Sequence, residues 1–549
     1  MSNKKNQNTN FIVQGSILAI ASIISRVVGM LYRIPLKGII GKVGNDYYGT
    51  AFEIYSIILI ISSYSLPLAV SKLVAARMET GEAKNTQKVL RGALFFAFIS
   101  GTIFMCIVFF FADYFAGILK TPMAAIPLRV LAPVILIVAI LGVFRGFFQG
   151  LHTMLPSAIS QIIEQIVNAV ISIVAAYYLF SYGARIGGVL GNDNYAPAYG
   201  AAGGTLGTGV GALFGLIFLL FIYLVFRSRF KKRVVRDHKK NTESYGEIMK
   251  ILILTIIPVL LSTTLYNISS ILDQGIFKNI VVSQGYDAKT ISEWWGVYTG
   301  EYKVLINVPI SIASAIAASA VPTLTTAFGA GDMEKVQSQI RSATRFILIV
   351  AFPCMIGMAV LSSPIMLFLF SDSDATSGNM LLAGSLAIVF YSLSTLSNGL
   401  LQGIDRLRIP VRNAAIALVL QLVFLVVALR AFDLNIYAVV YANAFYAFVM
   451  CVLNNLAVVK YSGAHQDFKT MYLQPGAASA VMGVAAYLVY QLLHLITHTA
   501  SISCIVAIVA GAAVYFVVML LIHGITEDDM LRFPGGTYLV KIAGRLGLL

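Results

Sequence analysis

The chain is a succession of apolar stretches, each long enough to cross a lipid bilayer. Of its 549 residues, 58% are apolar and only 11% are charged. A spanning helix needs about 20 mostly apolar residues. Fourteen stretches meet this requirement, centred near Ile23, Ile60, Ile103, Val138, Ile171, Phe218, Leu261, Ala313, Pro353, Ile388, Leu422, Phe445, Ala485 and Ala512. The pattern predicts an all-α polytopic membrane protein with 14 transmembrane helices and excludes a soluble fold.

The distribution of positive charge predicts the topology. Fourteen spans place both termini on one side, and most of the 39 Lys and Arg residues fall in the tails and loops of that side. By the positive-inside rule, both termini are expected in the cytoplasm. The basic run from Arg227 to Lys240 is expected to be a cytoplasmic connector against anionic headgroups or a topology anchor, and nucleic-acid binding is disfavoured. On the other side, residues 183–204 are expected to form a flexible outer loop or an insertion before the sixth span.

Two arginines lie inside the first span, which covers Phe11 to Ile40. Arg26 and Arg33 are seven residues apart and share a helical stripe with Ser22 and Gly29. An arginine near the centre of a span costs roughly 2.5–3.5 kcal/mol on insertion scales. The stripe is therefore expected to face a cavity that attracts an anion. An orientation signal, or snorkelling of Arg33 to the interface, is the alternative, although snorkelling would hardly rescue Arg26.

The sequence repeats itself at an offset of about 250 residues. Gly81-Glu82 after the second span matches Gly331-Asp332 after the eighth, and Gly-Phe-Phe-Gln-Gly at 146–150 matches Gly-Leu-Leu-Gln-Gly at 399–403. A six-span repeat predicts two lobes related by a pseudo-two-fold axis along the membrane normal, with a substrate site between them. The predicted domains are an N-lobe (1–230), a basic connector (231–247), a C-lobe (248–462), an added helix pair (463–525) and a cytoplasmic tail (526–549).

Polar side chains recur inside several spans. Gln161, Glu164, Gln165 and Asn168 form one polar face of the fifth span. Such a face lines a cavity or joins helices through hydrogen bonds, and both interpretations remain open. In the seventh span, Asp273 is a candidate ion-coupling residue or a carboxylate at the outer water boundary.

The eighth span begins with further polar residues. Lys303 and Asn307 share a face there, and Lys303 is a candidate third cation for an anion site.

Motifs of enzymes and metal sites are absent from the sequence. No Walker loop, HExxH or GxSxG occurs, and the four cysteines show no CxxC pairing. The glycine-rich run at 201–211 lacks the Lys-Ser/Thr of a phosphate loop, so it is interpreted as small-residue helix packing. The chain is therefore expected to be a transporter without a cofactor, coupled to the membrane potential or to Na⁺ or H⁺.

Three segments carry a resemblance to a known family. Ser-Arg-Val-Val-Gly at 25–29, the motif at 146–150 with Pro156, and Ile-Ser-Gln-Ile-Ile-Glu-Gln at 159–165 resemble the polysaccharide-exporter group of the MOP (MATE-like) superfamily. The similarity is greatest to its SpoVB/YtgP-like branch, which is related to MurJ-type lipid II flippases. It covers essentially the whole chain, including the last two spans.

The resemblance implies a flippase for an undecaprenyl-pyrophosphate-linked cell-wall precursor, most plausibly lipid II, working by alternating access. It places Arg26 in a cationic cavity, while Arg33 falls one residue later than the second family arginine and Lys303 one residue from a family arginine. Residues 473–525 would line a groove for the lipid tail. Another lipid-linked glycan, or a MATE-type cation or drug antiporter, is the alternative.

The resemblance also implies where the protein works and with what. It is expected to be a monomer in the bacterial plasma membrane. Its expected partners are the precursor, membrane lipids and the cell-wall synthesis machinery, with no nucleic acid.

The full set of expected substrate-cavity residues is Ser22, Arg26, Arg33, Glu164, Gln165, Asn168, Lys303 and Asn307.

Overall fold

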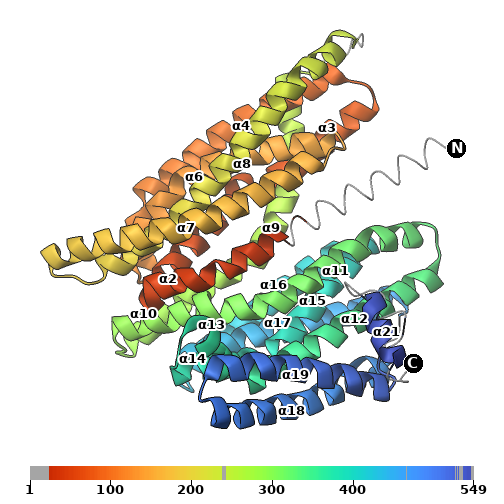
Figure 1. Ribbon diagram of the computed structural model, residues 1–549. Helices are drawn as coiled ribbons and strands as arrows, with labels where there is room; N and C mark the ends of the chain where they lie inside the picture. Colours follow the sequence, from red (N-terminus) through yellow and green to blue (C-terminus); the bar gives the residue numbers. More distant parts are fainter. Residues whose placement is uncertain are drawn as a thin grey trace. The chain divides into compact units, whose positions relative to one another are not determined.

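The computed structural model describes residues 21–545, except 22–23, 238–242, 465–466, 526, 528–529 and 531–535. All regular structure in this part of the chain is helical (Figure 1). Two compact units part between Gly300 and Glu301. The sequence repeat instead predicts that the second lobe begins at residue 248. The predicted lobes and these units therefore divide the chain at different residues, and the two-lobe arrangement is still only a prediction.

After a helical stretch at residues 24–31, the first unit contains nine labelled α-helices among its described residues. They are α2 (Arg33–Leu59), α3 (Leu66–Glu79), α4 (Ala83–Phe110), α5 (Ala112–Ile118), α6 (Ala125–Gly150), α7 (Leu155–Leu190), α8 (Tyr195–Val235), α9 (Tyr245–Ser283) and α10 (Ala288–Val297). Short π-helices follow α2 (Ile60–Tyr64) and α10 (Tyr298–Tyr302), and a 3₁₀ turn (Pro122–Ala124) precedes α6.

The second unit contains ten helices among its described residues. They are α11 (Lys303–Gly329), α12 (Met333–Val360), α13 (Ser362–Phe370), α14 (Ala375–Gly384), α15 (Ala387–Gly403), α16 (Arg408–Arg430), α17 (Asn435–Ser462), α18 (Gln474–Thr497), α19 (Ala500–Leu521) and α21 (Gly536–Arg545). A π-helix (Lys469–Leu473) precedes α18.

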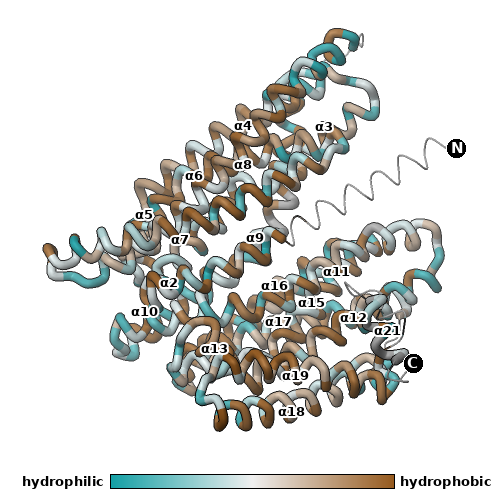
Figure 2. Tube along the Cα trace, in the orientation of Figure 1, coloured by the Kyte–Doolittle hydropathy of each residue, from teal (hydrophilic) through white to brown (hydrophobic). Residues whose placement is uncertain are grey.

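Many of these helices suit a bilayer. Eleven segments within the described residues are long and apolar enough to cross a membrane, or twelve if the bent pair α14–α15 forms one span. Each of the twelve contains one predicted span centre, and of the remaining two centres Leu261 lies in α9 while Ile23 lies outside the described residues. The chain is thus a multi-pass, all-helical membrane protein, and the count of fourteen stays a prediction. Figure 2 shows long hydrophobic stretches along α18 and α19.

The first two predicted spans meet at a single residue. Gly41 has φ 70° and ψ −175° inside α2, which breaks the helix directly after Ile40. Only glycine adopts such a backbone at little cost. The predicted end of the first span therefore coincides with this break, and Arg33 lies on the first-span side of it.

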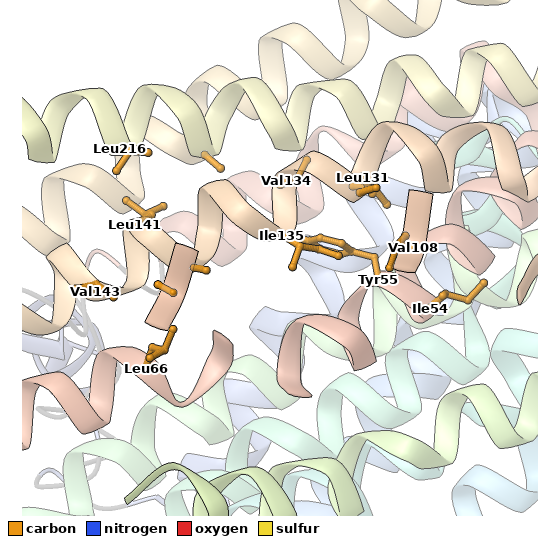
Figure 3. Packing of buried hydrophobic residues seen from close by; sticks show 14 of the residues in the cluster. Ile54, Tyr55, Leu66, Val108, Leu131, Val134, Ile135, Leu141, Val143 and Leu216 are labelled. Carbon is orange, nitrogen blue, oxygen red and sulfur yellow. The ribbon is translucent and has the colours of Figure 1, made fainter. Parts of the chain in front are cut away.

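The core of the first unit is aliphatic and aromatic. Figure 3 shows Tyr55 of α2 beside Ile135 and Leu131 of α6, with Val108 of α4 close by. These residues are at most 4% exposed. Because lipid is as apolar as this core, close packing rather than exclusion from water has to hold such helices together.

Glycines provide that close packing between α6 and α3. A Cβ on Gly146 would lie 2.5 Å from the carbonyl oxygen of Pro67, and one on Gly150 would lie 2.6 Å from Cβ of Val74. The 146–150 motif therefore brings the fourth predicted span against the second.

The matching motif of the second unit does the same. A Cβ on Gly399 of α15 would lie 2.9 Å from Cβ of Ala317, and one on Gly403 would lie 2.8 Å from Leu324, both on α11. Ala317 and Leu324 stand 250 positions after Pro67 and Val74, which is the offset of the sequence repeat.

The other repeated motif is a helix stop. Gly81 and Gly331 have φ values of 77° and 75°. The amide of Glu82 donates to Arg77 O at 2.7 Å, and that of Asp332 donates to Ala327 O at 3.1 Å. This is the left-handed glycine end of a helix, formed in the same way in each unit.

The expected flexible outer loop at 183–204 is wrong. α7 continues to Leu190 and α8 begins at Tyr195, so a four-residue turn joins two long helices. A Cβ on Gly183 would lie 2.5 Å from Tyr195 O, and one on Gly187 2.7 Å from Asn192 O. The glycines that suggested flexibility serve instead to bring the two helices together, with Tyr182 stacking edge-on against Tyr199.

Residues on both sides of the basic connector are hydrogen-bonded to the end of α3 and the start of α4. Asp237 accepts from the amide of Lys84 at 2.9 Å, and Glu243 accepts from Arg77 at 2.6 and 2.8 Å. Ser244 and Glu247 then form a capping box that starts α9.

Candidate functional site

The first-span arginines lie in different surroundings. Arg26 belongs to a helical stretch at residues 24–31 and its side chain is exposed. Arg33 is half-buried, with its guanidinium carbon 5.6 Å from the ring centre of Tyr48. No ion pair joins Arg26 to a carboxylate of the described residues, so it has its charge available for a ligand. Ser22 lies outside the described residues.

The arginine stripe runs beside the polar face of α7. A Cβ on Gly29, midway between the two arginines in sequence, would lie 3.3 Å from Oε1 of Gln165. Gln165 is half-buried. The stretch between the two arginines therefore approaches α7 at Gln165, while a shared cavity of Arg26, Arg33 and Gln165 stays a prediction.

Glu164 is held by an arginine that sequence reasoning missed. Nη2 of Arg145, on α6, lies 2.7 Å from Oε2 of Glu164, and Nε of Arg145 donates to Ser160 at 3.0 Å. The two charged side chains are 16% and 18% exposed. The pair joins α6 to α7, which favours the structural interpretation of Glu164 that the sequence left open. The sequence feature that could have revealed this ion pair is the arginine directly before the 146–150 motif.

Asn168 also joins helices. It is buried, and its Oδ1 accepts from Ser172 at 2.9 Å and from Thr208 of α8 at 3.5 Å. A Cβ on Gly207 would lie 2.1 Å from Oγ of Ser172, and one on Gly211 2.5 Å from Glu164 O. The interpretation of residues 201–211 as small-residue packing is thus confirmed.

The remaining expected site residues are spread over both units. Lys303 begins α11 and is half-buried, while Asn307, one turn later, is exposed. Asp273 of α9, in the first unit, is 1% exposed and accepts from Ser269 at 3.5 Å. This burial argues against the interpretation of Asp273 as a carboxylate at a water boundary. Their participation in one site stays a prediction.

Sequence reasoning missed a buried ion pair in the first unit. Nζ of Lys278, on α9, lies 2.5 Å from Oδ1 of Asp46 on α2, and both side chains are 1% exposed. The ammonium also donates to Thr121 at 2.6 Å, and Ser292 of α10 donates to Asp46 at 2.6 Å. The partners stand 232 positions apart, so no local pattern could reveal them.

Further polar contacts complete this cluster. Thr50 donates to Asp46 at 3.1 Å and accepts from Gln274 at 2.5 Å, while Trp295 places its ring centre 5.8 Å from Nζ of Lys278. Opposite charges are matched and hydrogen-bonded here, as burial requires. The cluster joins α2, α9 and α10. Because its charges neutralise each other, it attracts an anion only weakly.

The cations of the first unit fall into two kinds, those paired with a carboxylate and those without such a partner. Lys278 and Arg145 are neutralised by Asp46 and Glu164 within the first unit. Arg26 is exposed and has no such partner among the described residues. Chemically, the exposed guanidinium can donate bidentate hydrogen bonds to a phosphate or carboxylate.

Comparison with known proteins places the chain in a family. The polysaccharide biosynthesis protein family matches residues 12–328, well over half of the chain, and the MatE family matches residues 304–427.

Two relatives come from Bacillus subtilis (strain 168). Lipid II flippase MurJ is 25% identical over 528 residues, covering 91% of this chain and 93% of the relative. Stage V sporulation protein B is 30% identical over 130 residues, covering 24% of this chain and 25% of the relative.

Solved structures share the fold. A lipid II flippase MurJ in an inward closed conformation superposes with a TM-score of 0.65 at 15% identity, covering 94% of this chain and 99% of the other. An inward-facing multidrug resistance MATE transporter of the MOP superfamily gives 0.65 at 16% identity, covering 80% and 95%. A lipid II flippase and a multidrug transporter are thus among the proteins that the chain resembles, and by the match over residues 12–328 the chain belongs to the polysaccharide biosynthesis protein family.

Proposed function

We propose that this protein is a flippase that carries a lipid-linked cell-wall precursor, lipid II foremost, from the inner to the outer leaflet by alternating access. The observation that carries the proposal is the likeness to a lipid II flippase over 91% of the chain. The exposed Arg26 supports it, because a pyrophosphate headgroup is an anion that suits a guanidinium.

The test is direct. In a bacterial strain with no other lipid II flippase, depletion of this protein should make lipid II accumulate on the cytoplasmic face. Unchanged exposure of lipid II on the outer surface would refute the proposal.

A second candidate cargo is another lipid-linked glycan. The match of residues 12–328 to the polysaccharide biosynthesis protein family favours it, because the description of that family is not restricted to lipid II. Restored viability of a lipid II flippase-deficient strain that expresses this protein would favour lipid II. Failure to restore viability, with normal protein levels, would favour the other glycan.

The remaining expectations form part of the same proposal. We place both termini in the cytoplasm, in the plasma membrane of a bacterium, and take the transporter to act as a monomer. A cytoplasm-negative potential is worth about 2.3 kcal/mol per charge per 100 mV and would draw an empty cavity carrying Arg26 and Arg33 inward. Collapsing the potential and the sodium gradient separately in whole cells distinguishes this coupling from a cation site at Asp273.

A further inference from the structure

A cavity opens at the surface of the second unit between α11 and α12. Its volume is about 360 Å³. This lies in the range of roughly 300–1,000 Å³ that is usual for small-ligand sites. The cavity-lining residues of α11 end at Thr323 and those of α12 begin at Ser338, so it lies within a few turns of the connection between the two helices.

The lining is polar but uncharged. Hydroxyl and amide side chains come from both helices: Ser319, Thr323, Ser338, Gln339 and Ser342. Phe346 adds an aromatic ring, and none of the described lining residues carries a formal charge. Exposed polar groups on spanning helices normally face protein or water rather than lipid, so this surface is poorly suited to contact with acyl chains.

The cavity offers both hydrogen-bond acceptors and donors, the donors including the side-chain amide of Gln339 and the hydroxyl of Ser338. The hydroxyls of Ser319 and Thr323 donate to Ile316 O and Ala320 O at 2.9 Å each, which leaves their lone pairs available. Oε1 of Gln339 is buried and accepts no hydrogen bond from the described residues. A fitting ligand therefore carries both hydrogen-bond donors and acceptors, no formal charge to match the uncharged lining, and an apolar face for Phe346.

These properties exclude the other parts of a lipid-linked precursor. A pyrophosphate is bound most strongly by charged donors, and none of the described lining residues is a cation. A polyprenyl tail would leave Oε1 of Gln339 without a donor. A saccharide has hydroxyl and acetamido donors together with an apolar C–H face that packs on an aromatic ring.

We propose that the cavity between α11 and α12 binds the saccharide part of the lipid-linked substrate. The inference rests on the proposed function and adds to it a recognition site for the sugar within the second unit.

The test compares two ligands on purified protein in nanodiscs: undecaprenyl pyrophosphate, and the same lipid carrying the disaccharide of the precursor. The native protein should prefer the glycosylated lipid by about tenfold, the equivalent of one or two hydrogen bonds. Ala320→Phe, which fills the cavity, should abolish this preference and leave affinity for the bare lipid unchanged. Ala318→Phe is the matched control, because Ala318 is exposed on the same helix and does not line the cavity.

Gln339→Leu is a second variant that keeps the size of the side chain and removes the buried acceptor. It should lower the preference severalfold, and it decides the matter if Ala320→Phe does not fold. Folded variants that retain the native preference would overturn the cavity assignment while leaving the flippase proposal intact. Native protein that binds neither lipid would instead refute the proposed function, and the cavity assignment with it.

Discussion

An arginine precedes the glycine pair 146–150 in the first unit, whereas an asparagine precedes the matching pair 399–403 in the second. Arg145 reaches Glu164 at 2.7 Å and so joins α6 to α7. Oδ1 of Asn398 accepts from Asn454 at 2.6 Å, and Oδ1 of Asn454 accepts from Asn413 at 2.9 Å, which joins α15, α17 and α16.

In both units a glycine thus allows two helices to approach closely, but the hydrogen bonds beside it join the helices with different chemistry. Charged groups are costly to bury and tolerate no loss of a partner, whereas amides are cheaper and more forgiving. The difference indicates that the helix packing of the first unit depends on pairing buried cations with carboxylates. Arg26 stands out because it has no such carboxylate partner among the described residues. Four experiments can break or sharpen the comparison.

The largest effect is expected at the buried pair of the first unit. Lys278→Met leaves Asp46 charged and unpaired, which should lower the free energy of unfolding by about 3–5 kcal/mol. Asp46→Asn combined with Lys278→Met should recover most of this loss. Thermal and denaturant unfolding of purified protein in detergent measures both. A double variant as unstable as the single one would show that charge matching is not what stabilises this cluster.

The next effect concerns transport rather than stability. Arg26→Ala should slow flipping roughly ten- to a hundredfold, the worth of a charge-assisted hydrogen bond, with protein levels unchanged or raised. Arg26→Lys should retain partial activity, since it keeps the charge and loses the planar fork. Lys303→Ala in the second unit should be milder. Loss of protein together with activity in Arg26→Ala would assign Arg26 a structural role.

A smaller effect is expected where the two units differ directly. Arg145→Ala should cost about 2 kcal/mol of stability, less than a fully buried pair because both side chains retain some exposure. Asn398→Ala should cost about 1 kcal/mol, the worth of one neutral hydrogen bond. Equal shifts in melting temperature for Arg145→Ala and Asn398→Ala would contradict the distinction between the charged pair of the first unit and the amide hydrogen bonds of the second.

Effects of similar size should come from the glycines themselves. Gly146→Ala places a methyl group 2.5 Å from a backbone oxygen, whereas Gly399→Ala places it 2.9 Å from a side-chain methyl. Both should destabilise by about 1–2 kcal/mol through overpacking, the former more. Detergent melting curves test the order, and a stabilising Gly146→Ala would mean that α6 and α3 have room to separate.

Local patterns in the sequence predicted much of this fold. Apolar length located the spans, since each candidate span of the described residues contains a predicted centre. The repeat was also informative, because Gly81 and Gly331 end their helices alike. Glycine content misled at 183–204, since the same residue permits a flexible loop or a close helical crossing, and only the partner surface decides which.

The candidate site was less predictable for a physical reason. Arg26 could be singled out because a charge within a span is costly wherever it lies. Lys278 stood near the end of a span and resembled an interfacial lysine, yet its partner Asp46 lies 232 residues earlier. Whether a polar group such as Glu164 faces a cavity or a partner depends on helices remote in sequence.

The joined helices α7 and α8 have a consequence for the space outside the bilayer. At 1.5 Å per residue, the 36 residues of α7 extend about 54 Å, against a hydrocarbon thickness of about 30 Å. Because this length exceeds the thickness of the bilayer, one end of the α7–α8 hairpin is expected to project beyond the membrane. The turn at 191–194 is mostly exposed, so a protease should reach it, and an epitope inserted there should be displayed outside the bilayer.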